Sequence, residues 1–421
     1  MSSRPVRTLG LYAATVVALV ACGGEFGVPS YDGDGLRYPV SMAADPSGQW
    51  IYVVGANFDR LHSGGIVRVL DTAQNKWVVQ GSVEVPSHAA GVLLQPAGAP
   101  DGSHRLYVAA REDDSVSIID IKANGAGPPT LDCGQPAGQL GPCAGDHRIG
   151  GAQKDDPDVG ADPVQIDLIA APDGSGLLLQ VVATGDGRVT LVDPQLKAGA
   201  AGVNPKILDH MQLGAGLSAL VTSPLTGRTY VADSRLNRLY THGLSQAVDE
   251  TGAATGAWTI DRQDTIALPR ASGGEYARGM TLSLDGSRLY VAYRSPNALL
   301  IVDVAPDDSG APANLLLDTI GLGGRPAQVV VAPTGPKGRE RIYVSCYGTD
   351  DIWVVDPELR TVVDVFELAH SPYGMAAVPV PDAQGELKWR LYAGLFTLHE
   401  VLAIDIDPSA AKPGAVLATI K

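Results

Sequence analysis

Short apolar runs, separated by polar turns, follow one another along almost the whole chain. Residues 341–346 (RIYVSC) and 351–356 (DIWVVD) show the pattern: a run with a tyrosine, a polar break, and a second run ending in aspartate. Runs of this length bounded by Gly, Pro, Asp and Ser are typical of β-strands, and apolar positions at helical spacing are hard to find. The pattern therefore predicts an all-β chain.

The tyrosine run recurs seven times, at intervals of 49 to about 71 residues. We expect Leu178 or Leu179 to replace the tyrosine in the third copy. The other six copies carry Tyr52, Tyr107, Tyr230, Tyr290, Tyr343 and Tyr392. Six of the runs that follow end in aspartate, whereas the fourth copy has Thr241-His242-Gly243 at that point.

Each copy contains enough apolar runs for a four-stranded sheet. A turn with Pro, Asp or Gly precedes each tyrosine run, a further apolar run precedes each turn, and a weaker run follows the aspartate. One such sheet cannot bury both its faces, but sheets packed around a ring cover one another. The sequence predicts a seven-bladed β-propeller of four-stranded antiparallel blades over residues 38–421. Because VLATI (416–420) already supplies the last fourth strand, the way in which the ring closes stays open.

Two stretches carry a family resemblance. RLYVAYRSPNALLIVD (288–303) and RIYVSCYGTDDIWVVD (341–356) resemble the repeat of the YVTN/lactonase-like (YncE-like) propellers, Tyr-Val-Thr-Asn followed by a Val-Ile-Asp-like strand. The resemblance covers almost the whole predicted propeller and implies a seven-bladed fold. It says little about function, because propellers host unrelated activities.

The first 21 residues predict a secretory signal peptide. Arg4 and Arg7 precede an apolar stretch from Leu9 to Ala21, which at 13 residues is too short to span a bilayer. Residues 19–22 (LVAC) resemble the lipobox of bacterial lipoproteins. An ordinary signal peptide followed by an incidental cysteine is the alternative.

The lipobox resemblance implies cleavage before Cys22 and a lipid on its thiol, so that the chain has a membrane partner in the bacterial envelope. Residues 22–37, rich in glycine, then form a flexible tether. In lipoproteins an aspartate after the lipidated cysteine favours retention in the inner membrane. Here Gly23 follows it, so we expect the outer membrane, on its periplasmic or surface side.

Export also explains the other cysteines. Cys133 and Cys143 lie in a Gly- and Pro-rich loop, where an oxidising compartment favours a disulfide. Closing this loop of about 11 residues would stabilise the fold by slightly less than ~3 kcal/mol. A zinc pair is the alternative, although the spacing suits zinc poorly and only His147 lies nearby. We expect Cys346 to be a buried free thiol.

The charge of the chain excludes one class of partner. The formal net charge is −15, with a sequence pI near 4.9, and Lys and Arg nowhere cluster with aromatic residues. A phosphate backbone would be repelled, so nucleic acid is not expected as a partner. We expect a soluble monomeric propeller on its tether.

Candidate site residues fall in loops at one face of the predicted ring, around the channel mouth. Loops that lead into the first strands supply the predicted ligand-binding residues His88, Asp162, Arg278, Arg325, His370 and Tyr373. Four histidines fall in neighbouring units, so a transition-metal site is a second hypothesis, although the loops place them at different distances from the axis. Its ligands would be His62, His88, His370 and His399, with Glu400.

Motifs for hydrolysis are missing: the chain has no G-x-S-x-G, no H-E-x-x-H and no phosphate-binding glycine loop. It also lacks the C-x-x-C-H motif for haem attachment, and no cofactor is identified. We therefore expect a non-enzymatic binding or scaffold propeller for a protein or small-molecule ligand at the channel mouth. A lactonase-like hydrolase or a metal-dependent redox enzyme at the same mouth is the alternative.

Overall fold

The computed structural model describes residues 35–95, 104–125, 127–136, 140–151, 158–174, 176–194, 205–270 and 274–421. The predicted signal peptide (1–21), Cys22 and most of the predicted tether lie outside the described residues. Within these ranges the helices are two short 3-10 turns, Gly145–His147 and Pro336–Gly338. No described helix is long and apolar enough to cross a membrane.

The described strands form seven antiparallel sheets, which confirms the predicted seven-bladed propeller. Blade one contains β1 (Pro39–Ala44), β2 (Trp50–Gly55), β3 (Gly65–Asp71) and β4 (Lys76–Val85). Blade two contains β5 (Ala89–Gln95), β6 (Arg105–Ala110), β7 (Ser115–Asn124), β8 (Gly127–Asp132) and β9 (Arg148–Gly150). Blade three contains β10 (Pro163–Ala170), β11 (Leu177–Ala183), β12 (Arg188–Asp193) and β13 (Lys206–Gln212). Blade four contains β14 (Leu217–Thr222), β15 (Thr229–Asp233), β16 (Arg238–Val248) and β17 (Ala254–Ala267).

The last three blades follow the same order. Blade five contains β18 (Ala277–Leu282), β19 (Arg288–Arg294), β20 (Asn297–Asp303) and β21 (Leu315–Gly321). Blade six contains β22 (Pro326–Ala332), β23 (Arg341–Cys346), β24 (Asp351–Asp356) and β25 (Thr361–Glu367). Blade seven contains β26 (Pro372–Pro381), β27 (Leu387–Leu395), β28 (Glu400–Asp405) and β29 (Val416–Ile420).

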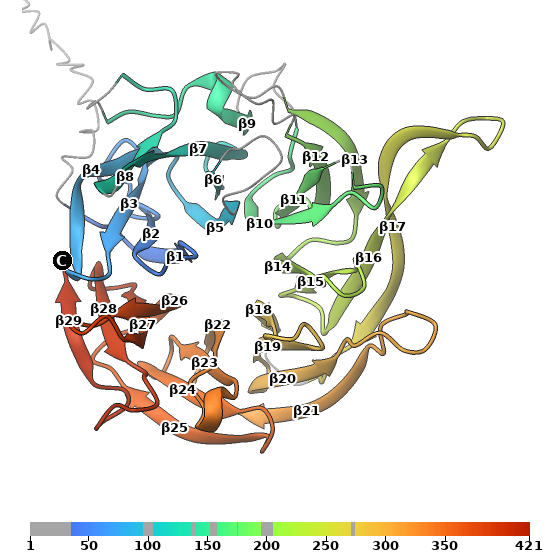
Figure 1. Ribbon diagram of the computed structural model, residues 1–421. Helices are drawn as coiled ribbons and strands as arrows, with labels where there is room; N and C mark the ends of the chain where they lie inside the picture. Colours follow the sequence, from blue (N-terminus) through green and yellow to red (C-terminus); the bar gives the residue numbers. More distant parts are fainter. Residues whose placement is uncertain are drawn as a thin grey trace, which may run out of the picture.

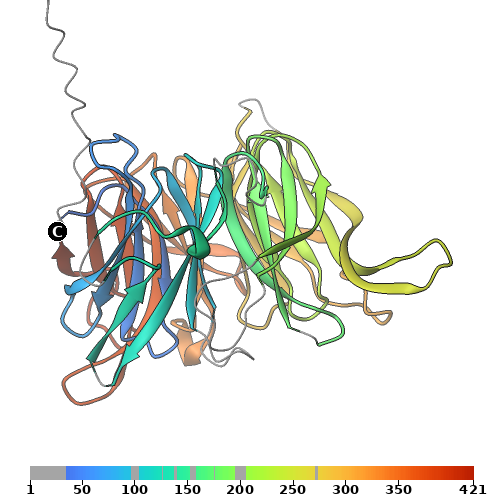
Figure 2. The ribbon, with the colours of Figure 1, turned by 90° about the horizontal axis from the view of Figure 1, so that it is seen from above.

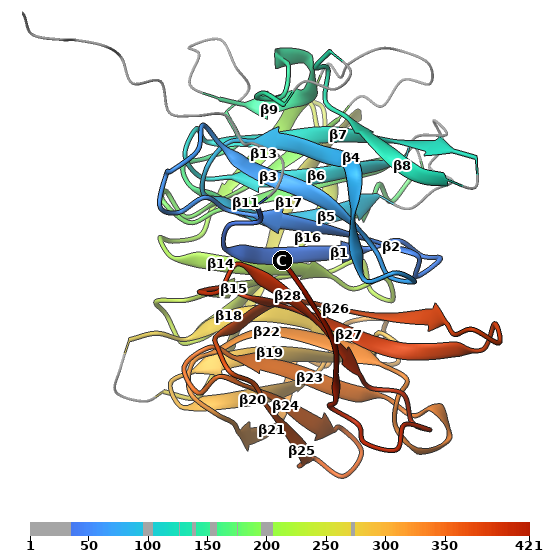
Figure 3. The ribbon, with the colours of Figure 1, turned by 90° about the vertical axis from the view of Figure 1, so that its left-hand side faces the viewer.

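The blades surround a central channel, with each first strand innermost and each fourth strand at the rim (Figure 1). Edge-on views show hairpin loops on two opposite faces (Figures 2 and 3). The β16–β17 hairpin extends beyond the rim (Figures 1 and 2). We call the face that carries the loops between second and third strands the upper face. The apolar core lies between adjacent blades, in clusters that combine residues from two sheets.

The six tyrosines are buried and occupy one register position, as predicted. In the third blade, however, the residue at this position is Gln180. Gln180 lies three residues before Ala183, the partner of the first residue of β10, just as Tyr52 lies three residues before Gly55, the partner of the first residue of β1. The expectation that Leu178 or Leu179 replaces the tyrosine is therefore wrong. A buried polar side chain stands there, which hydropathy alone did not indicate.

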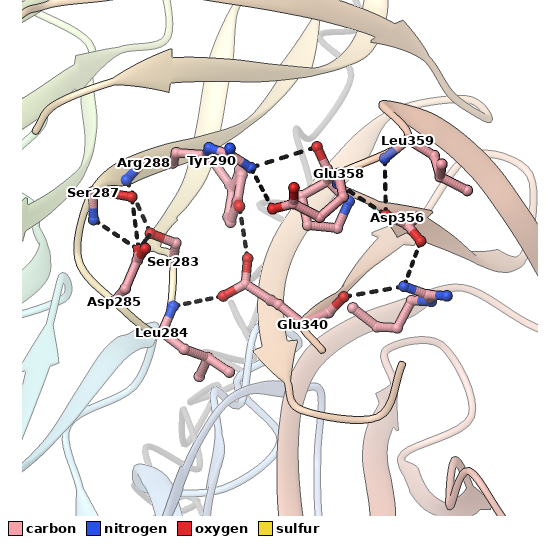
Figure 4. Close-up of polar contacts among 12 residues, drawn as sticks. Ser283, Leu284, Asp285, Ser287, Arg288, Tyr290, Glu340, Asp356, Glu358 and Leu359 are labelled. Atoms are coloured by element: carbon pink, nitrogen blue, oxygen red, sulfur yellow. Dashed lines mark hydrogen bonds and ion pairs between the residues drawn. The ribbon is translucent and has the colours of Figure 1, made fainter. Parts of the chain in front are cut away.

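The tyrosine position also connects neighbouring blades by polar contacts, as Figure 4 shows for blades five and six. The Tyr290 hydroxyl donates to Glu340 Oε1 at 2.6 Å, and Glu340 Oε2 accepts the amide of Leu284 at 2.5 Å. Burial raises the pKa of the Glu340 carboxyl. Nearby, Arg288 Nη1 reaches Glu358 Oε1 at 3.3 Å. Tyr290 thus buries its ring while its hydroxyl binds a side chain of the next blade.

The ring closes without exchange of a strand between the ends of the described chain. The C-terminal β29 pairs with β28 inside blade seven, and it lies beside β4 of blade one (Figure 1). Trp77 Nε1 donates to the backbone oxygen of Lys421 at 2.7 Å. The Tyr392 hydroxyl lies 3.2 Å from the Thr72 oxygen and 2.7 Å from Asn75 Oδ1. Side-chain contacts between blades seven and one therefore hold the seam.

The predicted disulfide between Cys133 and Cys143 is confirmed, with the two Cα atoms 4.9 Å apart. Its loop interrupts the fourth strand of blade two, since β8 and β9 pair with opposite ends of β7. Cys143 Sγ lies 3.5 Å from the Glu84 oxygen on β4, and Leu140 packs with Trp77 against the cluster that contains the C-terminal strand. The described residues of this stapled loop therefore contact blade one near the seam.

Cys346, predicted to be a buried free thiol, is buried and unpaired in the structure. Burial raises the pKa of its thiol, so the group stays protonated and unreactive at neutral pH.

Candidate functional site at the channel mouth

Every first strand begins with a β-bulge against the second strand of its blade. The register shifts between Pro39 and Ser41 in β1, and at the corresponding start of the other six first strands. A bulge bends a strand and changes the direction of its side chains. The second residue of each first strand accordingly lines one cavity of about 730 Å³ in the channel.

These seven residues form the inner ring of the site. They are Val40, Ala90, Val164, Ser218, Arg278, Ala327 and Tyr373. Five of them are small or short, so the channel stays open. The two large side chains, Arg278 of blade five and Tyr373 of blade seven, supply a guanidinium group and a phenol group to the wall of the cavity.

A second ring comes from the residue four positions after the tyrosine position, where the second strand reaches the upper face. Six of these residues line the cavity: Arg111, Thr184, Ser234, Arg294, Tyr347 and Phe396. In blade one the residue is Ala56, and Phe58 lines the cavity instead. This position was not among the predicted site residues. It lies four residues after each of the six tyrosines of the repeat, so the sequence contains a signal for it.

The residue just before several first strands has a left-handed backbone. Tyr38, His88, Asp162 and Arg325 have φ values of 50°, 56°, 57° and 54°, and in blade four Gly216 has 105°. Such a conformation is unfavourable for a residue with a Cβ atom, by about 1 kcal/mol or more. Four blades accept this strain for a large polar or aromatic side chain, which is typical of functional sites.

Arginines dominate one part of the cavity wall, which we call the arginine half. Its members are Arg111, Arg235, Arg278, Arg294 and Arg325, accompanied by the two lining carboxylates Asp162 and Glu275. Three of the arginines have an acidic neighbour. Arg111 Nε lies 3.4 Å from Asp162 Oδ1, and Glu275 Oε2 lies 3.0 Å from Arg294 Nη1 and 3.5 Å from Arg325 Nη2.

Arg294 and Arg278 differ in how they are held. Arg294 is buried and braces the wall, because its Nε also donates to the Pro326 oxygen at 3.0 Å. Burial and the nearby Arg278 charge lower the pKa of the Arg294 guanidinium. The Nε of Arg278 is buried without a hydrogen-bond partner among the described residues. Arg278 is therefore the cation whose hydrogen bonds a bound anion would complete.

Glu275 is the acid between these cations. The hydrogen bond from Arg294 lowers the pKa of the Glu275 carboxyl, and the charges of Arg325 and Arg278 act in the same direction. The carboxylate is thus held ionised, which makes it a weak proton acceptor at neutral pH.

Four aromatic rings line the opposite part of the cavity, which we call the aromatic half: Phe58, Tyr347, Tyr373 and Phe396. Phe396 is the centre of this group. Its ring centroid lies 5.6 Å from that of Phe58 and 5.7 Å from those of Tyr347 and Tyr373. Tyr38 packs behind them, with its ring 5.0 Å from Phe396 and 4.5 Å from His399.

The structure brings four of the six predicted ligand-binding residues into the cavity wall: Asp162, Arg278, Arg325 and Tyr373. His88 lies behind the wall instead, with its ring 5.2 Å from Phe58. His370 is exposed and precedes the first strand of blade seven by two residues. Neither histidine lines the cavity. His88 stands in the same place before its first strand as Asp162 and Arg325, but its ring packs against Phe58 instead.

The predicted metal ligands His62, His88, His370, His399 and Glu400 are not brought together. In the described ranges no three His, Cys, Asp or Glu side chains are placed to share an ion. His399 Nδ1 accepts the amide of Tyr38 at 3.0 Å, and Glu400 pairs with Lys421 Nζ at 3.3 Å. The first contact joins blade seven to blade one, and the second lies within blade seven.

No protein-family model and no curated protein matches the chain. Solved structures do. A periplasmic gluconolactonase from Pseudomonas aeruginosa is 19% identical, with a TM-score of 0.56 over 82% of this chain and 89% of that chain. A candidate 6-phosphogluconolactonase from Bacteroides fragilis is 15% identical, with a TM-score of 0.55 over 80% and 86%.

A third similar structure is a hydrazine synthase from Kuenenia stuttgartiensis, 16% identical, with a TM-score of 0.52 over 88% of this chain and 96% of that chain. At such identities the likeness establishes the propeller fold and no activity, since one fold hosts unrelated functions.

Proposed function

We propose that this chain is an envelope-anchored binding propeller that takes a small anionic molecule at the mouth of its channel. The charge of the cavity carries the proposal. Five arginines and only two carboxylates line it, in a chain whose formal net charge is −15. Gathering like charges destabilises a fold, and proteins accept such a conflict mainly where a ligand resolves it.

The arginine half suits a carboxylate or a phosphate. Guanidinium groups form paired, charge-assisted hydrogen bonds to such oxygens. Arg294 is already fixed by Glu275 and by the Pro326 oxygen, while the buried Nε of Arg278 has no described partner. A cavity of about 730 Å³ also lies within the size range of small-ligand sites.

The test is calorimetric titration with D-gluconate, inorganic phosphate and uncharged D-glucose. We expect at least one anion to bind, more weakly as salt is added, and glucose not to bind. Arg278→Met should weaken anion binding by about ten-fold or more, the loss of one charged hydrogen bond. Arg360→Met, an exposed arginine on the β24–β25 turn of the opposite face, is the matched control and should bind as the unaltered protein does. No anion binding, or equal effects of both variants, would contradict the proposal.

A lactonase-like hydrolase is the second candidate, favoured by the similarity to the two lactonase propellers. Its proton acceptor would have to be Asp162 or Glu275, the two lining carboxylates. Both face arginines, and the lowered pKa of Glu275 makes it a weak base, so binding is the better-supported function. Hydrolysis of glucono-1,5-lactone above the buffer rate, abolished by Glu275→Gln or Asp162→Asn, would establish the hydrolase instead.

The envelope anchor rests on the sequence of residues 1–22, and the disulfide is consistent with an oxidising compartment. Mass spectrometry of the membrane-extracted protein should find an acylated N-terminal Cys22. Cys22→Ala should move the protein to the soluble fraction. An unmodified thiol on a soluble product would refute the anchor without touching the ligand site.

A further inference from the structure

We infer that the anion bound at the mouth is an aromatic carboxylate, a molecule with one flat apolar ring and one acidic group. The inference rests on the proposed anion-binding function and specifies its ligand. Its basis is that the arginine half and the aromatic half are two sides of one cavity.

The two halves come from different blades. The lining arginines belong to blades two, four, five and six, and the lining rings to blades one, six and seven. The wall of the cavity is thus charged on one side of the channel and aromatic on the other. A ligand that fills the cavity must meet both sides, so it needs a charged end and an apolar end.

The aromatic half is separate from the apolar core between the blades. The chain has four phenylalanines, and two of them, Phe58 and Phe396, stand at this mouth. The apolar clusters between blades, in the part of the chain that the structure describes, contain none of the four lining rings. Phe58 is 36% exposed. A ligand that covers this exposed apolar surface removes it from water, which makes the free energy of binding more favourable.

Arg325 joins the two halves. Its guanidinium carbon lies 5.9 Å from the Tyr347 ring centroid, and its Nη2 lies 3.5 Å from Glu275 Oε2. A guanidinium over a ring is attracted by the electrons of that ring and stays available to an acid at its edge. Arg325 is therefore placed to contact both the acidic group and the aromatic ring of one ligand.

The aromatic half favours an aromatic acid over a sugar acid. Phe58 and Phe396 have no hydrogen-bonding atom, so hydroxyl groups placed against them would lose their water without replacement. A flat ring instead packs against other rings in edge or offset contact, the arrangement that these four side chains already adopt among themselves.

The experiment is calorimetric titration with phenylacetate, acetate, D-gluconate and benzyl alcohol. Phenylacetate should bind about ten-fold or more tighter than acetate or gluconate, because only it covers the rings. Phe396→Leu should weaken phenylacetate binding about three- to ten-fold and leave acetate unchanged. Arg278→Met should weaken both. Leu398→Ala, in the same loop as Phe396, is the matched control and should change neither; Phe58→Leu serves if the Phe396 variant fails to fold.

The outcomes separate the two proposals. If acetate or gluconate binds as tightly as phenylacetate, or if Phe396→Leu and Phe58→Leu have no effect, the aromatic ligand is refuted while the anion site stands. If benzyl alcohol binds as tightly as phenylacetate, or if no anion binds, the anion site fails as well.

Discussion

The ring of His242 in blade four lies against the side chain of Gln180 in blade three, with Nε2 2.5 Å from Gln180 Oε1. Both side chains are fully buried. Gln180 Nε2 donates to Thr222 and Thr229, at 3.1 and 2.9 Å. At the other interfaces a tyrosine packs against an apolar residue of the next blade, whereas here two polar side chains bind each other. The unusual residues of two successive blades thus compensate each other.

The first prediction is a loss of stability in mild acid that depends on His242. Burial, with the charge of Arg228 as a second cause, lowers the pKa of His242 from 6.5 to about 4. Between pH 6.5 and pH 4 the unfolded chain binds a proton at this histidine and the folded chain does not. His242 therefore has no effect on the free energy of unfolding above pH 6.5, and it lowers that free energy as the pH falls from 6.5 to 4, by up to about 3 kcal/mol.

Asp167, whose Oδ2 accepts the Thr222 amide at 2.7 Å, acts in the opposite direction. Burial raises its pKa to about 6, so its folded form binds a proton earlier than the unfolded chain and gains stability as pH falls from 6. The measurement must therefore compare variants. Urea unfolding at pH 7 and pH 4.5 should show a smaller loss for His242→Leu than for the unaltered protein. Equal losses would show that His242 does not titrate as described.

The second prediction concerns the energy that couples the pair. His242→Leu leaves Gln180 Oε1 buried without its donor, and Gln180→Leu leaves His242 Nε2 without its acceptor, so each should cost about 1–3 kcal/mol at pH 7. The double variant should cost less than both together, by about 1 kcal/mol or more, because both unpaired groups are gone. Thr222 and Thr229, 3.0 Å apart, can still bond each other. Additive losses in urea unfolding would refute a direct pairing.

This pair also shows where sequence reasoning ends. The repeat of tyrosine and aspartate predicted the sheets, their number and their order, because the length of the apolar runs, the turn residues and the repeat itself are all visible in the sequence. It could not identify Gln180 as the tyrosine equivalent, because the adjacent leucines fit the apolar pattern better. The departure at His242 was visible in the sequence, but its partner lies 62 residues away in another blade.

The site was predictable to a similar extent. Asp162, Arg278, Arg325 and Tyr373 follow from loop position, and they do line the cavity. His88 and His370 lie in the same loops and do not. His88 has the same position before its strand as Asp162 and Arg325, but its ring packs against Phe58 of blade one, a contact between blades that the sequence does not show. Phe396 was missed because an apolar residue at a strand end has the same appearance as a core residue.

The third prediction concerns the stapled loop. Removing the disulfide with Cys133→Ser and Cys143→Ser should lower the free energy of unfolding by about 3 kcal/mol, the entropy of closing this loop. Because Leu140 packs with Trp77 at the seam, hydrogen exchange should accelerate in β4 and β29 more than in blade five. Reductant should bring the unaltered protein to the level of the variant and leave the variant unchanged. Uniform acceleration around the ring would contradict a local role.

The fourth prediction concerns the seam itself. Tyr392→Phe removes a hydroxyl that contacts the Thr72 oxygen and Asn75 in blade one, and should cost about 1 kcal/mol. Tyr343→Phe is the matched control, since the Tyr343 hydroxyl contacts Thr334 within its own blade at 2.6 Å. Both should lower stability similarly, but only Tyr392→Phe should increase hydrogen exchange of β1 and β26. The same exchange pattern in both variants would show that the seam depends on other contacts.

The fifth prediction separates stability from binding at Arg278. This side chain is close enough to Arg294 to lower its pKa, and its buried Nε lacks a described partner. Replacing it with methionine removes the repulsion and the unpaired donor while keeping an unbranched apolar chain. Without ligand, Arg278→Met should therefore be as stable as the unaltered protein in urea, or more stable by about 1 kcal/mol. With phenylacetate in excess the order should reverse, since the unaltered protein binds it about ten-fold or more tightly than the variant does and gains more stability from binding. A ligand-free variant that unfolds at lower urea concentration would assign Arg278 a structural role, and the excess of arginines at the mouth would then need another explanation.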